Sequence, residues 1–302
     1  MPILMPILKS LCLHLWPGST LKLWALMAEV KMPVIKRDRF INALLRRGKV
    51  MTGHSFYLPT EAPHFQVKID DEWFVFCTIH KNASSSIRRL IENASKVKRG
   101  DEESIFHFLF VNHLARSVGD INKSRNVMAF VRDPVERVVS CYQNKFIQRQ
   151  GNRTIFKDYG DVMGKGAEFA TFEQFVEGYI DRCFNGKSTV NKKHDRHIYT
   201  QHQQLLPLNY DIVARVEQFD SVLKSVGVSH YLPQGRENST SGKESFPGAA
   251  SISADILHQR YLSTGRTPDR DSLLTPRLVD KIKDLYHDDF LSFGHLFEVG
   301  AP

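Results

Sequence analysis

The sequence predicts an α/β fold in which a short, parallel central sheet lies between two layers of helices. Three segments rich in β-branched and aromatic residues have the composition of buried strands: Trp73–Ile79, Val127–Val131 and Tyr210–Glu217. The first two each end in a short polar loop, and an amphipathic helical pattern follows each loop directly. Strands and helices in this alternation form three-layer sandwiches with a parallel sheet.

The loop after the first strand has the features of a phosphate-binding site. It contains Lys81 and three consecutive serines, Ser84, Ser85 and Ser86. The helix that follows has apolar residues at helical spacing, namely Ile87, Leu90, Ile91, Ala94 and Val97. A strand that turns into a helix in this way directs backbone N–H groups and the positive end of the helix dipole at one point, where a phosphate binds favourably. Lysine adds charge there, and the serine hydroxyls add donors.

The same loop lacks the glycines of an ordinary ATP or GTP site. No glycine occurs between Trp73 and Arg99, so the pattern G-x-x-x-x-G-K-[ST] is absent. This absence counts against a P-loop kinase-like, ATP-dependent transferase, which remains an alternative. The structural alternative is a plain strand-to-helix turn in which Ser84 caps the helix.

The second strand leads into a helix whose start is specified by its sequence. Asp133 is expected as the N-cap, Pro134 as the first helical residue and Glu136 as the partner of Asp133 in a capping box. Apolar residues line one side of this helix: Val135, Val138, Val139, Tyr142 and Phe146. Arg132 at the end of the strand and Ser140 about two turns into the helix lie at the edge where open α/β sheets bind ligands. A guanidinium and a hydroxyl suit a second phosphate.

Together, the two segments resemble the cofactor motifs of sulfotransferases that use 3′-phosphoadenosine 5′-phosphosulfate (PAPS). The similarity is to the carbohydrate and bacterial group called sulfotransferase family 2. Phe130–Phe146 is similar to the 3′-phosphate motif of that family, and His80–Ile87 is similar to its 5′-phosphosulfate loop. Weaker similarity continues through Asp195–Gln201, Tyr210–Glu217 and Leu274–Gly294. The resemblance implies a sulfotransferase-like fold with a P-loop over about residues 73 to 295.

The resemblance also implies a reaction. PAPS would be the co-substrate, and its sulfuryl group would pass in line to a hydroxyl of a carbohydrate or glycoconjugate without a metal. Lys81 would stabilise the leaving phosphate, while Arg132 and Ser140 would hold the 3′-phosphate. The other cofactor-binding residues implied are those of the loop: Asn82, Ala83, Ser84, Ser85 and Ser86. A non-catalytic protein that binds a nucleotide or a glycan is a further alternative.

The catalytic base is predicted among the histidines. His107 and His113 lie between the two cofactor motifs, and the segment ending at His113 is similar to a histidine-containing stretch of bacterial relatives. An imidazole accepts a proton near neutral pH, so either residue is a candidate, and a structural histidine is the alternative for both. His197 and Gln201 belong to the weaker similarity, which places them close to the substrate.

Composition limits the ligands. The chain has 41 basic and 33 acidic residues, a net charge of +8, which favours anionic ligands. No nucleic-acid-binding module occurs, so nucleic acid is not expected as a partner. The four cysteines are scattered: Cys12, Cys77, Cys141 and Cys183. They lie far in sequence from the cluster of His194 and His197 and show no paired spacing, so no metal site is predicted.

The chain is expected to divide into an N-terminal segment, residues 1–60, and a sulfotransferase domain, residues 61–302. The N-terminal segment is apolar and basic, but none of its apolar runs reaches the ~18 to 20 residues of a membrane span. It could lie on a membrane surface or serve in docking. The dispersed cysteines favour a cytoplasmic enzyme, with peripheral membrane contact or a Golgi membrane location as alternatives. Gly151–Ala170 and Gly235–Ser253 are expected to form flexible loops.

Overall fold

The computed structural model describes residues 62–185, 194–206, 209–233 and 242–297. The predicted N-terminal segment, residues 1–60, lies outside these ranges. Within the described ranges, no helix combines the length and the apolar character needed to cross a membrane.

A four-stranded sheet forms the centre of the fold, in the order β1-β2-β3-β4. Its strands are β1 (His64–Ile69), β2 (Glu72–Cys77), β3 (Asn126–Val131) and β4 (Ile212–Arg215). Strands β2, β3 and β4 run parallel, with Val75 opposite Val127 and Val131 opposite Arg215. The three predicted strands are therefore confirmed as parallel neighbours.

The edge strand β1 was not predicted. It pairs antiparallel with β2 through a tight turn at Asp70 and Asp71, which both have positive φ, as hairpin turns require. Its alternate residues Phe65, Val67 and Ile69 are buried, so its sequence has the period of two that a half-buried strand shows.

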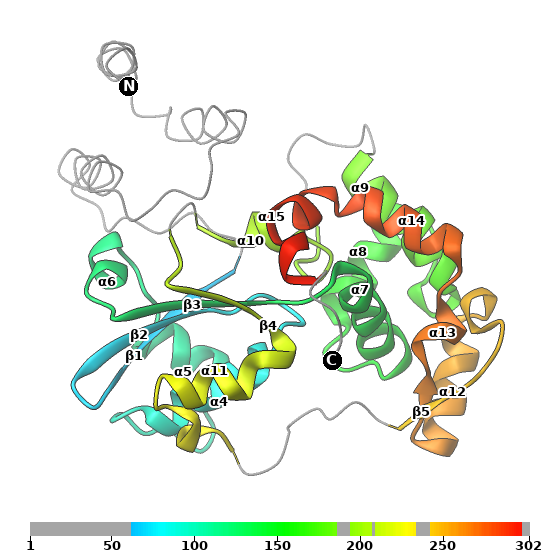
Figure 1. Ribbon diagram of the computed structural model, residues 1–302. Helices are drawn as coiled ribbons and strands as arrows, with labels where there is room; N and C mark the ends of the chain where they lie inside the picture. The colour runs from blue at the N-terminus through cyan, green and yellow to red at the C-terminus, as the bar shows by residue number, and fades with distance from the viewer. Residues whose placement is uncertain (1–61, 186–193, 207–208, 234–241, 298–302) are drawn as a thin grey trace, which may run out of the picture.

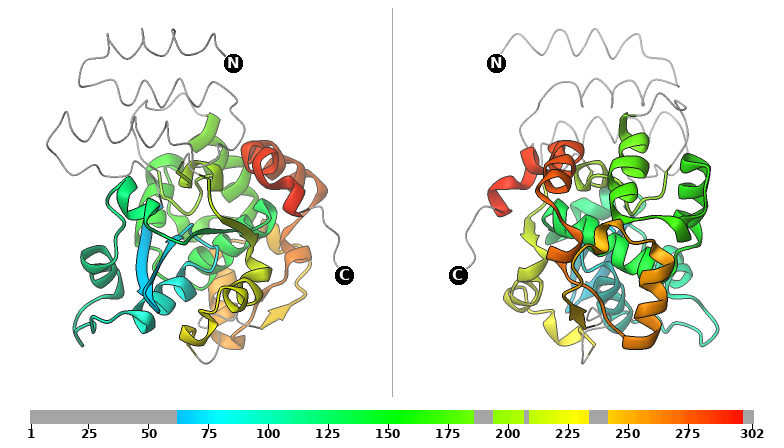
Figure 2. Two further views of the ribbon diagram at one scale, coloured as in Figure 1. Left: turned by 60° about the vertical axis from the view of Figure 1, so that its left-hand side comes forward. Right: turned by 90° about the vertical axis from the view of Figure 1, so that its right-hand side faces the viewer.

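Helices cover both faces of the sheet, as Figures 1 and 2 show. One face packs Phe76 and Phe130 against α4 (Ser84–Ala94), α5 (Ile105–Asn112) and α11 (Phe219–Ser225). The other face packs Val131 and its neighbours against α15 (His287–Phe297) and Val127 and its neighbours against α6 (Val118–Asn122). The short helix α10 (Gln201–Gln204) crosses above this second face. This is the predicted three-layer α/β arrangement.

A helical lobe continues from β3 and packs around its own aromatic core. Its elements are α7 (Pro134–Tyr142), the π-helix η1 (Gln143–Ile147), α8 (Arg153–Met163), η2 (Ala167–Phe169), the π-helix η3 (Gln174–Ile180), α9 (Asp181–Asn185), η6 (Ala249–Ser251), α12 (Ala254–Thr264), α13 (Arg270–Leu273) and α14 (Pro276–Leu285). The lobe also holds the two-stranded parallel sheet β5 (Lys243–Glu244) and β6 (Thr267–Pro268). The short helices η4 (Val216–Gln218) and η5 (Ser229–Tyr231) flank α11.

Several sequence expectations for local structure are corrected. Gly151–Ala170 is largely helical, because Ile155 and Tyr159 are fully buried and anchor α8 in the lobe. The described part of Gly235–Ser253 includes β5 and η6, and the remainder lies outside the described ranges. Val97 lies beyond the end of α4 and is exposed.

Phe146 lies at the centre of the lobe, and its replacement should destabilise the fold. It is fully buried, with ring centroids at 4.9 Å from Phe175 and 5.2 Å from Tyr142. Phe146→Ala should lower the free energy of unfolding by about 3–5 kcal/mol, because it removes buried apolar surface and leaves a cavity. Leu262→Ala on α12 is the control, since that side chain is 63% exposed. Urea unfolding measures both, and equal effects would contradict this packing.

Candidate active site

The loop between β2 and α4 presents an open helix N-terminus. Lys81 and Ala83 both have left-handed backbone conformations, with φ of 69° and 56°. Ala83 is the N-cap of α4, no side chain caps the helix, and its first turn holds no acidic residue. Ser84 is thus the first helical residue and not the cap, which corrects the structural alternative. The N–H groups of the first turn and the helix dipole are left to attract an anion.

The helix after β3 begins differently. The Asp133 carboxylate accepts hydrogen bonds from the backbone N–H groups of Val135 and Glu136, at 2.8 and 3.2 Å. With Asp133 as the cap and Pro134 at the first position, this N-terminus is satisfied within the chain, as the sequence predicts. The expected capping box does not form, because the Glu136 carboxylate pairs with Arg270. A ligand at this helix therefore has to be held by side chains. Those available are Arg132 at the end of β3 and Ser140, which is partly exposed on α7.

Several positively charged side chains lie close to the loop between β2 and α4. Burial, together with the charges of Lys145, Arg132 and Arg137, lowers the pKa of Lys81 to about 8. Burial also lowers the pKa of Arg132, against the opposing effect of the Glu217 and Glu136 carboxylates. Positive charges so close together repel one another when no anion lies between them. This edge of the sheet is therefore suited to an anion.

Arg137 holds the segment around His197, which is distant in sequence, next to the loop between β2 and α4. This buried guanidinium donates from Nε to the carbonyl of His80 and from Nη2 to the carbonyl of His197, both at 3.2 Å. The two imidazole rings lie with their centroids 4.5 Å apart. His197, which is far from Lys81 in sequence, consequently lies within the electrostatic influence of Lys81 and Lys145.

His197 and Asp195 form a dyad. The His197 Nδ1 lies 2.6 Å from Asp195 Oδ1, and Thr154 donates a hydrogen bond to the same carboxylate. Burial opposes ionisation of Asp195, but the hydrogen bond and charge of His197 bring its pKa to about 2. Burial lowers the pKa of His197 below its ordinary value, although Asp195 opposes this. An ionised Asp195 accepts from Nδ1–H and leaves Nε2 able to accept a proton.

His80 is held neutral. Burial, followed by the charges of His197, Arg137 and Arg88, lowers its pKa to about 2. Its backbone N–H donates to the Gln204 side chain at 3.4 Å. His80 thus presents an uncharged ring against the dyad.

Gln201 connects the loop after β2 with the end of β3. Its side-chain oxygen accepts from Asn82 Nδ2 at 2.5 Å and from the N–H of Arg132 at 2.9 Å. Its amide nitrogen donates to the carbonyl of Arg132 at 2.8 Å and to Asp289 at 3.2 Å. The amide is fully buried and has used its hydrogen-bonding capacity. Gln201 therefore positions other residues, which corrects the expectation that it binds substrate.

The two histidines predicted as bases lie elsewhere. His113 is buried, and its ring nitrogens bond the Gln66 carbonyl and the Ser95 hydroxyl, each at 2.9 Å. Ser95 is the C-cap of α4, so the 11 residues of that helix, about 16 Å, separate it from the loop. His107 is exposed on α5 and lies 2.6 Å from a Glu103 carboxylate oxygen. The structure gives His113 a position in the packing between β1 and α4.

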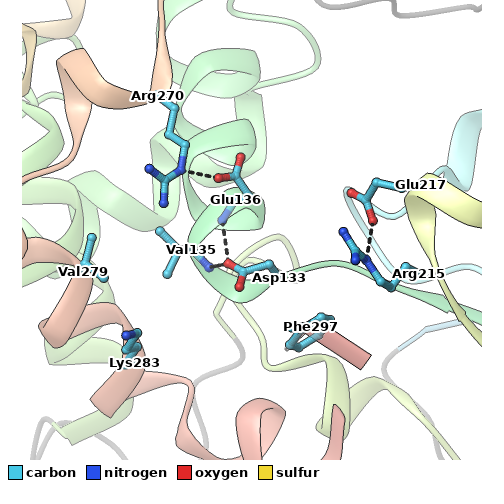
Figure 3. A pocket seen from close by; sticks show the side chains of 9 residues that line it. All are labelled: Asp133, Val135, Glu136, Arg215, Glu217, Arg270, Val279, Lys283 and Phe297. Atoms are coloured by element: carbon cyan, nitrogen blue, oxygen red, sulfur yellow. Dashed lines mark hydrogen bonds and ion pairs between the residues drawn. The ribbon is translucent and has the colours of Figure 1, made fainter. Parts of the chain in front are cut away.

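A pocket of about 370 Å³ lies where β3 and β4 end, and Asp133, the residue after Arg132, is one of its lining residues (Figure 3). Ion pairs join Arg270 to Glu136 and Arg215 to Glu217 on two of its sides. The lining residues are Asp133, Val135, Glu136, Arg215, Glu217, Arg270, Val279, Lys283 and Phe297. Charged side chains of both signs around a cavity of this size suit a polar ligand.

Some site residues were missed from the sequence. Arg137, Asp195, Lys145 and Lys243 are all close to the residues discussed above. Lys145 donates to the carbonyl of Gln150 at 2.7 Å, and Lys243 donates to the side chain of Gln143, the first residue of η1. Asp195 had a local signal, because it lies two residues before His197. Lys243 had none, because the fold brings it to η1 from 100 residues away.

Comparisons with known proteins identify the family of this chain. The family model described as "Sulfotransferase family" matches residues 63–296. Carbohydrate sulfotransferase 11 of Rattus norvegicus is 27% identical over 222 residues, which is 63% of this chain and 59% of the rat protein. The Mus musculus protein of the same name gives the same figures, and that of Danio rerio is 26% identical over 224 residues, 64% of this chain and 60% of the fish protein.

The chain thus spans about 59% of the length of the curated rat and mouse relatives. No solved structure matches it. The family match extends over most of the chain and includes the loop with Lys81 and the segment with Arg132 and Ser140. The chain therefore belongs to the sulfotransferase family.

Proposed function

We propose that this protein transfers a sulfuryl group from PAPS to a hydroxyl group of a carbohydrate or glycoconjugate. The observation that carries the proposal is the pair of unlike anion sites at one edge of the sheet. The first has an uncapped helix N-terminus and Lys81. The second has Arg132 and Ser140 beside a helix that is already capped. Relatives named carbohydrate sulfotransferase favour a carbohydrate acceptor.

The residues present fit PAPS. The first turn of α4, Lys81 and the serines would hold the 5′ end, where the backbone approaches closely. Arg132 and Ser140 would hold the 3′-phosphate, and the neighbouring pocket of about 370 Å³ would take the nucleoside. Bound PAPS supplies an activated sulfuryl group. That the reaction needs no metal remains a prediction, as do the cytoplasmic location and the membrane contact of residues 1–60.

The chain's own residues would assist the transfer in two ways. Lys81 stabilises the negative charge that develops on the leaving phosphate oxygen as the S–O bond breaks. His197 accepts the proton of the acceptor hydroxyl at Nε2 as the new O–S bond forms, while Asp195 holds the ring through Nδ1. The dyad replaces His113 and His107 as the proposed base, because it lies beside Lys81.

Arg132→Ala should remove the preference for a 3′-phosphate. Calorimetry should show binding of adenosine 3′,5′-bisphosphate weakened about ten- to a hundredfold, since a charged hydrogen bond is lost, and binding of AMP almost unchanged. Arg125→Ala is the control, because Arg125 pairs with Glu72 at the opposite end of the strands. An equal loss for both nucleotides would place the 3′-phosphate elsewhere. A wild-type preference for ATP with magnesium would support the kinase-like alternative.

Lys81→Ala should lower kcat by about a hundred- to a thousandfold, because Lys81 acts on charge formed in the transition state. Binding of adenosine 3′,5′-bisphosphate should fall much less. In the wild type, kcat/KM should decline above about pH 8, where Lys81 loses its proton in the free enzyme. Lys123→Ala, an exposed lysine over Trp73, serves as the control. Normal turnover with lost binding would contradict the role given to Lys81.

His197→Ala should lower kcat by about a hundred- to ten-thousandfold, as expected for loss of a general base. In the wild type, kcat/KM should fall only below the ordinary histidine pKa of about 6.5, because the pKa of His197 is lowered by burial. The variant should lose this acid limb. His295→Ala, an exposed histidine of α15, is the control. If His107→Ala loses rate and the acid limb while His197→Ala keeps both, the general base is His107 on α5.

A further inference from the structure

Three potential metal ligands meet outside the transfer site. Asp158 comes from α8, Cys183 from α9 and His194 from the segment that leads to the dyad. One oxygen, the sulfur and one ring nitrogen all lie within 4.8 Å of one another. Asp158 is buried, and the other two are partly buried. Figure 1 shows α8 and α9 in the same lobe.

The Asp158 carboxylate is held in one orientation. Its Oδ2 accepts from the Tyr179 hydroxyl at 2.5 Å and from the N–H of Asp195 at 2.9 Å. The other oxygen, Oδ1, faces the His194 Nδ1 at 3.3 Å. Carboxylates that bind a metal are likewise fixed by hydrogen bonds to groups that are not ligands.

The distances are close to those of a metal site. Neighbouring donor atoms of a tetrahedral zinc site lie roughly 3.3 to 3.8 Å apart, since the bonds are about 2.0 to 2.3 Å long. The largest separation here is 4.8 Å, so movement of about 1 Å by one side chain would close the set. A thiolate, an imidazole and a carboxylate together suit zinc, whereas calcium and magnesium prefer oxygen ligands.

We propose that Asp158, Cys183 and His194 bind one zinc ion, with a water molecule as the fourth ligand. The ion would replace the Asp158–His194 hydrogen bond and join α8, α9 and the start of the segment that carries Asp195. Because the N–H of Asp195 already bonds Asp158, the ion would stabilise the position of the dyad without taking part in transfer. No metal site was predicted from the sequence, because the cysteines lie far in sequence from the cluster of His194 and His197 and show no paired spacing.

The test uses the full chain, treated with chelator and titrated with Co²⁺. One equivalent should bind and produce the intense tetrahedral ligand-field bands and the thiolate charge-transfer band of a cysteine-ligated Co²⁺. Zn²⁺ should displace it and raise the Tm. Cys183→Ser should abolish the charge-transfer band, and both Cys183→Ser and His194→Ala should weaken Zn²⁺ binding at least about tenfold.

Controls separate this site from the other cysteines and histidines. Cys141→Ser and His230→Ala should keep the wild-type Co²⁺ spectrum, since both residues lie outside the cluster. Far-ultraviolet circular dichroism establishes that each variant is folded. The proposal is overturned if wild-type protein binds Co²⁺ without a thiolate band, or binds Zn²⁺ no more tightly than folded His194→Ala. Neither outcome bears on PAPS binding, which Arg132 and Lys81 test separately.

Discussion

The spacing between the loop that holds Lys81 and the end of β3 at Arg132 depends on the buried amide of Gln201. The Gln201 side chain bonds Asn82 in the loop after β2, and it also bonds the N–H and the carbonyl of Arg132 after β3. The Asp289 carboxylate of α15 accepts hydrogen bonds from the backbone N–H and from the side-chain nitrogen of Gln201. The two phosphates of one nucleotide lie at a fixed covalent distance, so a protein that binds both gains from fixing the two segments before the ligand arrives.

Two buried charged residues support this arrangement, and their burial costs free energy. Arg137 and Asp289 are both buried, and burial raises the pKa of Asp289 while the charge of Arg137 opposes that change. Within the described residues, Arg137 Nη1 and Asn82 Oδ1 are buried without a hydrogen-bond partner. Each such atom costs about 1–3 kcal/mol. Arg137 still fixes the carbonyls of His80 and His197, so it contributes to the geometry of the site more than to stability.

Local signals in the sequence predicted the parallel strands, the cap at Asp133 and the positions of Lys81, Arg132 and Ser140. Each depends on residues within about ten positions of one another, which a pattern can show. The role of Gln201 could not be found in this way, because its bond to Asn82 spans 119 residues. Nearness to the motifs in sequence favoured His113 as the base, whereas the fold brings His197 within the electrostatic influence of Lys81, a relation that no local pattern shows.

Buried hydrogen bonds of Asn82 explain how the loop between β2 and α4 keeps its conformation without glycine. Left-handed backbone at Lys81 and Ala83 costs roughly 1–2 kcal/mol for each residue, a cost that glycine would avoid. The side chain of Asn82 between them donates to the carbonyl of Phe130 at 2.9 Å and to Gln201. These buried bonds hold the loop in its strained form and tie it to β3. A glycine loop would gain backbone freedom at the point where the fixed distance to Arg132 has to be maintained.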